Sequence, residues 1–247
     1  MQLDLRVLRT ARGMTVAALD YEPRRPRGVA LAVAHGYSSS KHNLDALCGF
    51  LASHGCHVVS IDFPGHKLGA SGGRLACVDD LTDALGAAVR FARETYGVPV
   101  YTPGHSMGAT TALRACAADP DVAGAISIAT GYGRPTALGA LALRGSIDLR
   151  SAYVDGLTLQ EVVTQTEPLL DAALAALAGR PVLYVAAERD GMVTRASADE
   201  LFRRAPEPKT FALVPSDHTL AGENARAAVL AWLNALHPRD ALSIATT

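Results

Sequence analysis

The feature that most constrains this chain is a regular alternation of short apolar runs with segments of helical spacing. The apolar runs, each suited to a strand covered on both faces, occupy residues 29–34, 57–61, 98–102, 122–129, 181–187 and 210–214. Between them apolar residues keep helical spacing, as in residues 79–96, where Gly97 ends the pattern. This order predicts an α/β fold with a mostly parallel central sheet flanked by helices. Ligand sites in such sheets lie at the carboxyl ends of the strands.

The first residues follow a different pattern, with a period of two. Leu3, Leu5 and Val7 alternate with polar residues, the alternation breaks at residues 10–13, and it resumes at residues 14–19. We therefore expect an antiparallel hairpin at one edge of the sheet.

Residues 131–179 interrupt the alternation, because they contain no good strand but several helical signals. One of these signals is a capping box at residues 158–161. We interpret the segment as a small helical cap inserted after the sixth strand, rather than as crossover helices, because one crossover rarely needs so much chain. The predicted α/β core is then residues 1–130 and 180–237, followed by a frayed tail at residues 238–247.

Composition and charge argue against several classes of protein. With 49% hydrophobic and 19% charged residues, the 247-residue chain has ample material for a buried core. The net charge of -1 gives no electrostatic reason to expect nucleic acid as a partner. No eighteen consecutive residues are apolar and no signal-peptide pattern is present, so we expect a cytoplasmic protein without a membrane span. The four cysteines lack metal-type spacing, and we interpret them as free thiols rather than disulfide partners.

A serine flanked by glycines stands near the middle of the chain. The apolar run at residues 98–102 leads directly into Gly104-His105-Ser106-Met107-Gly108, and helical spacing follows from Ala109 without a spacer. A strand, a sharp turn and a helix in this order hold Ser106 in strained backbone geometry, for which the two glycines leave room. The pentapeptide alone is weak evidence, but its position between strand and helix strengthens it. The rival interpretation is a turn serine in an inactive relative.

Ser106 has candidate partners later in the chain. A serine hydroxyl is a poor nucleophile at neutral pH, so it needs a general base and a third group that orients this base. His218 follows the last predicted strand and Asp190 follows the strand before it, so both lie at the same edge of the sheet as Ser106. The order serine, aspartate, histidine is the one expected after such a turn. Glu188 is a competing acid, and we prefer Asp190 because Gly191 supplies the turn.

These motifs resemble those of the serine-type α/β-hydrolases over nearly the whole chain. The matching segments are His35-Gly36, Asp62-Phe63-Pro64-Gly65-His66, Gly104-His105-Ser106-Met107-Gly108, Asp190-Gly191-Met192-Val193 and Asp217-His218. Among capped members the chain is most similar to bacterial esterases and to lysophospholipase-like and monoacylglycerol-lipase-like enzymes. Their loop after the fourth strand runs on as Gly-His-Gly-x-Ser, whereas residues 65–71 here are expanded by two residues.

The resemblance implies the α/β-hydrolase fold and a set of functional residues. Ser106 would be the nucleophile, His218 the base and Asp190 the orienting acid. The backbone N–H groups of Tyr37 and Met107 would form an oxyanion hole, whose donors stabilise the tetrahedral oxyanion of acyl transfer. For the Tyr37 hydroxyl two interpretations stay open, namely contact with the substrate and simple packing.

The substrate pocket is the part of the site that the sequence determines least. We expect His66 to line it or to bond within its own loop, and leucines of the cap to form an acyl pocket, although such leucines often only pack a helix. These leucines are Leu138, Leu141, Leu143, Leu157, Leu169 and Leu170. His35 and His105 are interpreted as supporting residues, and Asp217 as a capping or solvated carboxylate. No histidine pair has metal-site spacing and no cofactor motif is present, so we expect neither a metal nor a cofactor.

The sequence therefore predicts a serine esterase or thioesterase that acts on a small-molecule acyl ester or thioester through an acyl-enzyme. The same fold also hosts acyltransferases, lyases and cyclases, so a non-hydrolytic enzyme with the same triad is the alternative. A binding protein with a relic site is a third interpretation. Acyl length and oligomeric state do not follow from the sequence.

Overall fold

A computed structural model describes residues 1–133 and 146–238 of the chain. The strands are β1 (Gln2–Arg9), β2 (Thr15–Glu22), β3 (Ala30–Val33), β4 (His57–Ile61), β5 (Val100–His105), β6 (Val122–Ile128), β7 (Val182–Ala187) and β8 (Lys209–Val214). The helices are η1 (Lys41–Leu44), α1 (Asp45–Ser53), α2 (Val78–Tyr96), α3 (Met107–Ala118), α5 (Ser146–Ser151), α6 (Leu159–Ala176), α7 (Arg195–Arg204), α8 (Ala221–Asn224) and α9 (Arg226–Leu236). None of these described helices is long and apolar enough to cross a lipid bilayer.

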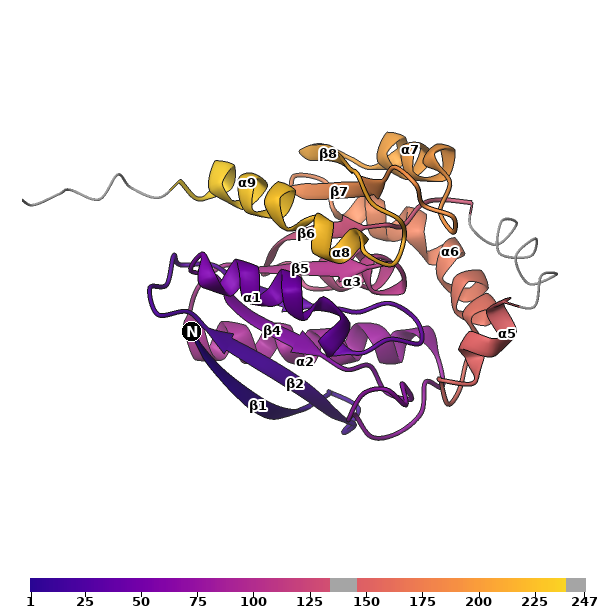
Figure 1. The fold of residues 1–247 in the computed structure, drawn as a ribbon, viewed down its shortest axis with the longest axis horizontal. Helices are drawn as coiled ribbons and strands as arrows, with labels where there is room; N and C mark the ends of the chain where they lie inside the picture. The colour runs from indigo at the N-terminus through magenta and orange to yellow at the C-terminus, as the bar shows by residue number, and fades with distance from the viewer. Residues whose placement is uncertain (134–145, 239–247) are drawn as a thin grey trace, which may run out of the picture.

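All eight strands form one sheet, in the order β1-β2-β4-β3-β5-β6-β7-β8 (Figure 1). The pairs β1–β2 and β2–β4 are antiparallel, and the remaining pairs are parallel. The expected hairpin at one sheet edge and the mostly parallel sheet are therefore confirmed. Because β3 and β5 are neighbours at the centre, the loops that leave their carboxyl ends meet at the middle of one sheet edge.

Two hydrophobic cores cover the two faces of the sheet, and β3 contributes to both. Ala30 and Ala32 join the core shared with α2, α3 and α6, whereas Leu31 and Val33 join the core shared with α1 and α9. Successive strand residues point to opposite faces, so a strand covered on both sides is apolar throughout. Figure 1 shows the corresponding helices on the two sides of the sheet. The continuous apolar runs of the sequence follow from this double coverage.

Local capping fixes several helix ends. Gly97 ends α2 in a left-handed conformation with a φ of 64°. At the start of α6, the Thr158 hydroxyl accepts the N–H of Glu161 at 3.2 Å, and the Glu161 carboxylate accepts the N–H of Thr158 at 2.8 Å. Thr194 caps α7 by accepting the N–H of Ser197 at 3.2 Å. The helix boundaries expected at Gly97 and at residues 158–161 are confirmed.

The segment between β6 and β7 carries α5 and α6. Helix α6 packs against α3, and its residues Leu170 and Leu174 are buried in the same core as Leu113 of α3. Residues 134–145 of the expected cap and residues 239–247 of the expected tail lie outside the described residues. The division of the chain into core, cap and tail therefore stays a prediction. Within the expected cap segment, α6 packs on α3 and covers one face of the sheet.

We expect Leu113→Ala to lower the free energy of unfolding by about 2–5 kcal/mol, because Leu113 is fully buried and its truncation leaves a cavity. Leu236→Ala, near the end of α9 where the side chain is partly exposed, should cost about 1 kcal/mol or less. Chemical denaturation of both variants measures the difference. Equal losses would contradict the placement of Leu113 in the core.

Candidate active site

Ser106 lies at the junction of β5 and α3, where the chain turns sharply. Its backbone has a φ of 56° and a ψ of -114°, a strained conformation that residues other than glycine rarely adopt. The flanking glycines make the turn possible, because a Cβ on Gly104 would overlap the backbone of Gly108 and a Cβ on Gly108 would overlap the carbonyl of Ala34. The turn presents the Ser106 side chain at the carboxyl end of a central strand.

The structure brings His218 and Asp190 to this turn from two further loops. His218, after β8, places its Nε2 3.0 Å from the Oγ of Ser106. Its Nδ1 lies 2.8 Å and 3.0 Å from the two carboxylate oxygens of Asp190, which follows β7. An ionised carboxylate only accepts hydrogen bonds, so Nδ1 carries the proton and Nε2 is left to accept the Ser106 hydroxyl. This arrangement is suited to removing a proton from Ser106.

The Asp190 carboxylate is held by its own loop. It accepts the backbone N–H groups of Met192 and Val193, both at 2.8 Å. Burial raises the pKa of Asp190, but the hydrogen bond from His218 and those from the two N–H groups outweigh it and lower the pKa below its usual range. Asp190 is therefore ionised and fixed in position at neutral pH.

The competing carboxylates lie elsewhere. Glu188 is exposed just after β7. Asp217, next to His218 in the chain, accepts the backbone N–H of Leu220 at 2.9 Å, which is a local capping contact. Asp190 is thus the carboxylate in contact with His218.

The loop after β3 packs directly beside Ser106. A Cβ on Gly36 would lie 3.4 Å from the Cβ of Ser106. Among the described residues, neither the backbone N–H of Tyr37 nor that of Met107 has an acceptor. Two N–H groups without acceptors next to a serine hydroxyl are suited to binding an oxyanion.

His35 and His105 fix the loops around the serine. Burial lowers the pKa of His35, so its imidazole stays neutral and both ring nitrogens form hydrogen bonds. Its Nδ1 donates to the carbonyl of Gly36 at 2.7 Å, and its Nε2 accepts the N–H of Phe63 at 3.0 Å. His105 donates from Nε2 to the backbone carbonyl of His218 at 2.7 Å.

Tyr37 and His66 pack against each other, with ring centroids 5.8 Å apart. The Tyr37 hydroxyl donates to the carbonyl of Leu157 at 2.9 Å, so it links the loop after β3 to the start of α6. His66 is buried, and its Nδ1 donates to the carbonyl of Pro64 at 3.1 Å. Burial lowers the pKa of His66 to about 4. His66 therefore bonds within its own loop as a neutral imidazole.

A buried ion pair ties the loop after β3 to the loop after β4. Nζ of Lys41 lies 2.5 Å from Oδ2 of Asp62, and the two side chains are 3% and 0% exposed. Asp62 also accepts the N–H groups of Lys41 and Ala70, both at 2.8 Å. Burial raises the pKa of Asp62, but hydrogen bonds from Lys41 and Ala70 outweigh it and hold the pKa below its usual range. A Cβ on Gly69 would overlap Asp62, so the expanded loop is shaped around this carboxylate.

A pocket of about 110 Å³ opens beside Ser106. It is lined by Gly36, Tyr37, Ser38, Ser39, Asn43, Leu44, His105, Ser106, Arg150, Leu159, Met192, His218 and Thr219. Tyr37 thus belongs to the lining and His66 does not. Among the described residues, no group of three His, Cys, Asp or Glu side chains is placed to hold a metal ion.

The leucines expected to line an acyl pocket fall into two groups. Leu138, Leu141 and Leu143 lie outside the described residues. The leucines at positions 157, 169 and 170 are described and do not line the pocket at Ser106. Its apolar lining comes instead from Leu44, Leu159 and Met192.

The eight-stranded sheet and the strained serine turn at the end of β5 define an α/β-hydrolase. Residues 24–166 match the family described as serine aminopeptidase, S33. Because this match spans more than half of the chain, the protein belongs to that family. The fold and the family resemblance expected from the sequence are confirmed. No curated protein matches the sequence.

Solved structures show the same fold over nearly the whole chain. The esterase domain of a Rhodothermus marinus protein has a TM-score of 0.68 at 25% identity and covers 96% of this chain and 98% of its own. A Pyrococcus furiosus esterase has a TM-score of 0.72 at 17% identity, covering 96% and 89%. The α/β hydrolase GrgF from Penicillium sp. sh18 has a TM-score of 0.70 at 17% identity, covering 95% and 97%. Family membership and these neighbours support hydrolase activity.

Sequence reasoning missed Lys41, Ser38 and Arg150. A lysine in a polar loop is usually solvated, and only the fold buries Lys41 against Asp62. Ser38 has a φ of 54°, unusual without a glycine, and its hydroxyl accepts a hydrogen bond from Arg150 at 3.4 Å. Arg150 reaches the pocket from a distant part of the sequence, so no local signal marks it.

We expect Lys41→Met and Asp62→Leu each to lower the free energy of unfolding by about 3–5 kcal/mol, because each leaves a buried charge without its partner. The double variant should lose less than the sum of the two, since neither charge remains. Denaturant unfolding of the four proteins measures this coupling. Arg195→Ala with Asp199→Ala, at an exposed ion pair of α7, is the matched control and should show a coupling of about 1 kcal/mol or less. Additive losses at Lys41 and Asp62 would contradict their pairing.

Stability should fall in acid, because Asp62 and Asp190 both have folded-state pKa values below the usual range. Such a carboxyl gives its full stabilisation above its unfolded-state pKa of about 3.9, and this is lost as pH falls through the lower folded-state pKa. Urea unfolding at a series of pH values should therefore show a steep loss below about pH 4. Asp190→Asn should reduce this loss, whereas Glu188→Gln, at an exposed site, should leave it unchanged. The same acid-side slope in Asp190→Asn and the wild type would count against the assignment.

Proposed function

We propose that this protein is a serine hydrolase that cleaves a carboxylic ester or thioester through an acyl-enzyme intermediate. The observation that carries the proposal is the hydrogen-bonded series of Ser106, His218 and Asp190, with contacts of 3.0 Å and 2.8 Å on a strained turn. The same series activates a serine on several unrelated folds. Ser106 is the nucleophile, His218 the general base, and Asp190 the residue that orients and stabilises the imidazolium.

In the acylation half-reaction, Oγ of Ser106 attacks the carbonyl carbon while its proton passes to Nε2 of His218. The carbonyl electron pair moves to oxygen, and the N–H groups of Tyr37 and Met107 donate to this oxyanion. When the tetrahedral intermediate collapses, the bond to the alcohol or thiol breaks. The leaving group takes the proton from Nε2, and the acyl group stays on Ser106.

In the deacylation half-reaction, neutral His218 removes a proton from water while the water oxygen attacks the acyl carbon. Collapse of the second intermediate returns an electron pair to Oγ of Ser106, which regains its proton from Nε2 of His218. The carboxylic acid leaves and the starting state is restored. The hydrogen bond from His105 to the carbonyl of His218 keeps the base at the turn throughout.

The pocket supports an ester rather than a peptide with a free amino terminus. An α-ammonium group is best bound by a carboxylate, and none of the described residues lining the pocket is Asp or Glu. The charged side chain of the lining is Arg150, which lies with the hydroxyls of Ser38 and Thr219. The Rhodothermus marinus neighbour, 25% identical, is an esterase domain, which supports the same choice.

We expect Ser106→Ala to lower kcat for p-nitrophenyl acetate by about a millionfold, because the nucleophile is lost. Asp190→Asn should lower kcat by about ten thousandfold, because the tautomer of His218 is no longer fixed. A fluorophosphonate probe should label the wild type at Ser106, as read by mass spectrometry of the modified peptide. An aminoacyl p-nitroanilide should be cleaved far more slowly than the ester.

Ser53→Ala, an exposed serine of α1, is the matched control and should keep the wild-type rate and labelling. Ester hydrolysis by Ser106→Ala at the wild-type rate would refute the mechanism. A folded wild type that neither hydrolyses esters nor reacts with the probe would favour a non-hydrolytic enzyme on the same fold. Faster cleavage of the anilide than of the ester would overturn the choice of bond.

A further inference from the structure

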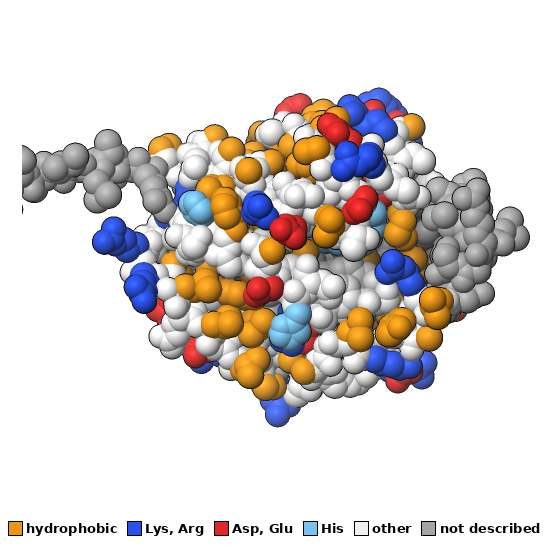
Figure 2. All heavy atoms as spheres, viewed as in Figure 1, with side chains coloured by type: hydrophobic (Ala, Val, Ile, Leu, Met, Phe, Trp, Pro, Cys, Tyr) orange, Lys and Arg blue, Asp and Glu red, His pale blue; other side chains and the backbone are white. Residues whose placement is uncertain are grey.

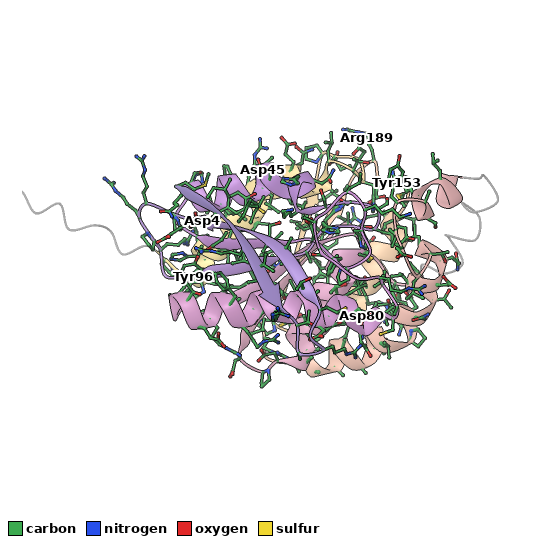
Figure 3. The ribbon with its side chains drawn as sticks, turned by 90° about the horizontal axis from the view of Figure 1, so that it is seen from below. Asp4, Asp45, Asp80, Tyr96, Tyr153 and Arg189 are labelled. Atoms are coloured by element: carbon green, nitrogen blue, oxygen red, sulfur yellow. The ribbon has the colours of Figure 1, made fainter. Side chains whose placement is uncertain are left out.

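Strand β1 is an outer edge of the sheet and carries an exposed apolar row. Leu3, Leu5 and Val7 are 49%, 79% and 76% exposed, and as alternate residues of the strand they lie on one face of the sheet. Figure 2 shows hydrophobic side chains gathered where β1 lies at the lower left, and in Figure 3 the β1–β2 hairpin, with Asp4 labelled, lies nearest the viewer. Natural edge strands are usually protected by charged side chains, especially lysine, by proline or by a bulge. Strand β1 has no proline, lysine or bulge, and its charged residues Asp4, Arg6 and Arg9 include both signs.

The hydrogen-bond pattern shows which residues of β1 have free backbone groups. The N–H of Thr10 donates to the carbonyl of Met14 at 2.9 Å, and this pair continues the register of the two strands. In an antiparallel pair such bonded positions recur at every second residue, so even-numbered residues of β1 bond to β2. On the other side of β2, the carbonyl of Ala17 accepts the N–H of Asp62, which is consistent with the same alternation. The N–H and C=O groups of Leu3, Leu5 and Val7 therefore point away from β2, toward the open edge of the sheet.

A second copy can pair with this edge in one favourable register. Two antiparallel β1 strands related by a twofold axis must oppose odd-numbered residues with odd-numbered residues for their outward groups to bond. With the axis at Leu5, Leu3 faces Val7 of the second copy, and each Asp4 faces Arg6 of the other copy. A shift by two residues would instead place Asp4 opposite Asp4, or Arg6 opposite Arg6. Like charges opposite each other are destabilising, whereas opposite charges are stabilising.

We propose that the protein forms a twofold dimer by antiparallel pairing of β1 with β1 of a second copy, centred on Leu5. This contact joins the two sheets into one, places the two apolar rows side by side on one face and adds two Asp4–Arg6 pairs between the copies. Within one copy Arg6 already contacts Asp4 at 3.1 Å and the buried Asp20 at 3.0 Å, so its guanidinium is held on the face where the second Asp4 would arrive. The partner is thus identified by the self-complementarity of residues 3–7.

The first test is the oligomeric state of the full chain by sedimentation velocity and light scattering, over about two decades of concentration because a dimer population follows concentration. We expect a dimer that dissociates on dilution. Leu5→Lys places two ammonium groups at the axis and should raise the dissociation constant by on the order of a hundredfold. Leu213→Lys, at an exposed position of the opposite edge strand β8, is the matched control and should leave it unchanged. Circular dichroism and thermal unfolding establish that both variants are folded.

The second test is the register, read from cross-linking with a short bis-maleimide. Leu5→Cys should cross-link to itself, because the two residues face each other across the axis. Leu3→Cys alone should not, because its own counterpart lies four residues further along, at about 14 Å. A mixture of Leu3→Cys with Val7→Cys should cross-link. The wild type, with three buried cysteines and a half-buried Cys77, gives the background.

A wild type that stays monomeric over the whole concentration range would overturn the proposal. So would a dimer that survives Leu5→Lys, or one that is lost in Leu213→Lys, since either result places the interface elsewhere. Cross-linking of Leu3→Cys as efficient as that of Leu5→Cys would refute the register. None of these readouts depends on ester hydrolysis.

Discussion

The strained backbone of Ser106 is the constraint on which the packing at the carboxyl ends of β3 and β5 depends. Such a conformation costs on the order of 1–3 kcal/mol and persists only where its surroundings hold it. Gly108 packs its backbone against the carbonyl of Ala34, so α3 begins directly beside the end of β3. The same approach brings the loop of Gly36 against the serine, and with it the N–H of Tyr37. The close contact that permits the turn therefore also assembles the two amides proposed for the oxyanion.

The loop after β3 is also held by buried polar contacts with the loop after β4. Asp62 accepts from Lys41 and from Ala70, and His35 accepts the N–H of Phe63, so three segments meet at buried polar groups. A buried ion pair is weak evidence for stability, because desolvation offsets most of the attraction between the charges. Its effect here is on position: the pair fixes the distance between the loops after β3 and β4. The loop that carries Tyr37 is thus anchored at both ends.

The sequence revealed those parts of the fold that depend on local chemistry. Strand β4 has the bounds expected from its apolar run, because a strand covered on both faces leaves an uninterrupted signal. The turn at Ser106 was predictable because its signals are local: two flanking glycines and a helical pattern that follows directly. Lys41 and Arg150 were not, because their roles arise only when distant segments approach. The helical pattern of α6 likewise could not tell a cap from a core helix, and the structure packs it on α3.

The edge hairpin and the serine turn belong to one continuous hydrogen-bonded structure. In β2, the carbonyl of Ala17 accepts the N–H of Asp62 at 2.9 Å and its N–H donates to the hydroxyl of Ser71 at 2.8 Å. That hydroxyl donates to the carbonyl of Asp62 at 2.7 Å, so β2 holds both sides of the loop in which Asp62 binds Lys41. Strand β1 is the outer neighbour of β2. A second copy paired with β1 would extend this ladder outward, and the contacts of Ala17 with Asp62 and Ser71 connect that ladder to the loop in which Asp62 binds Lys41.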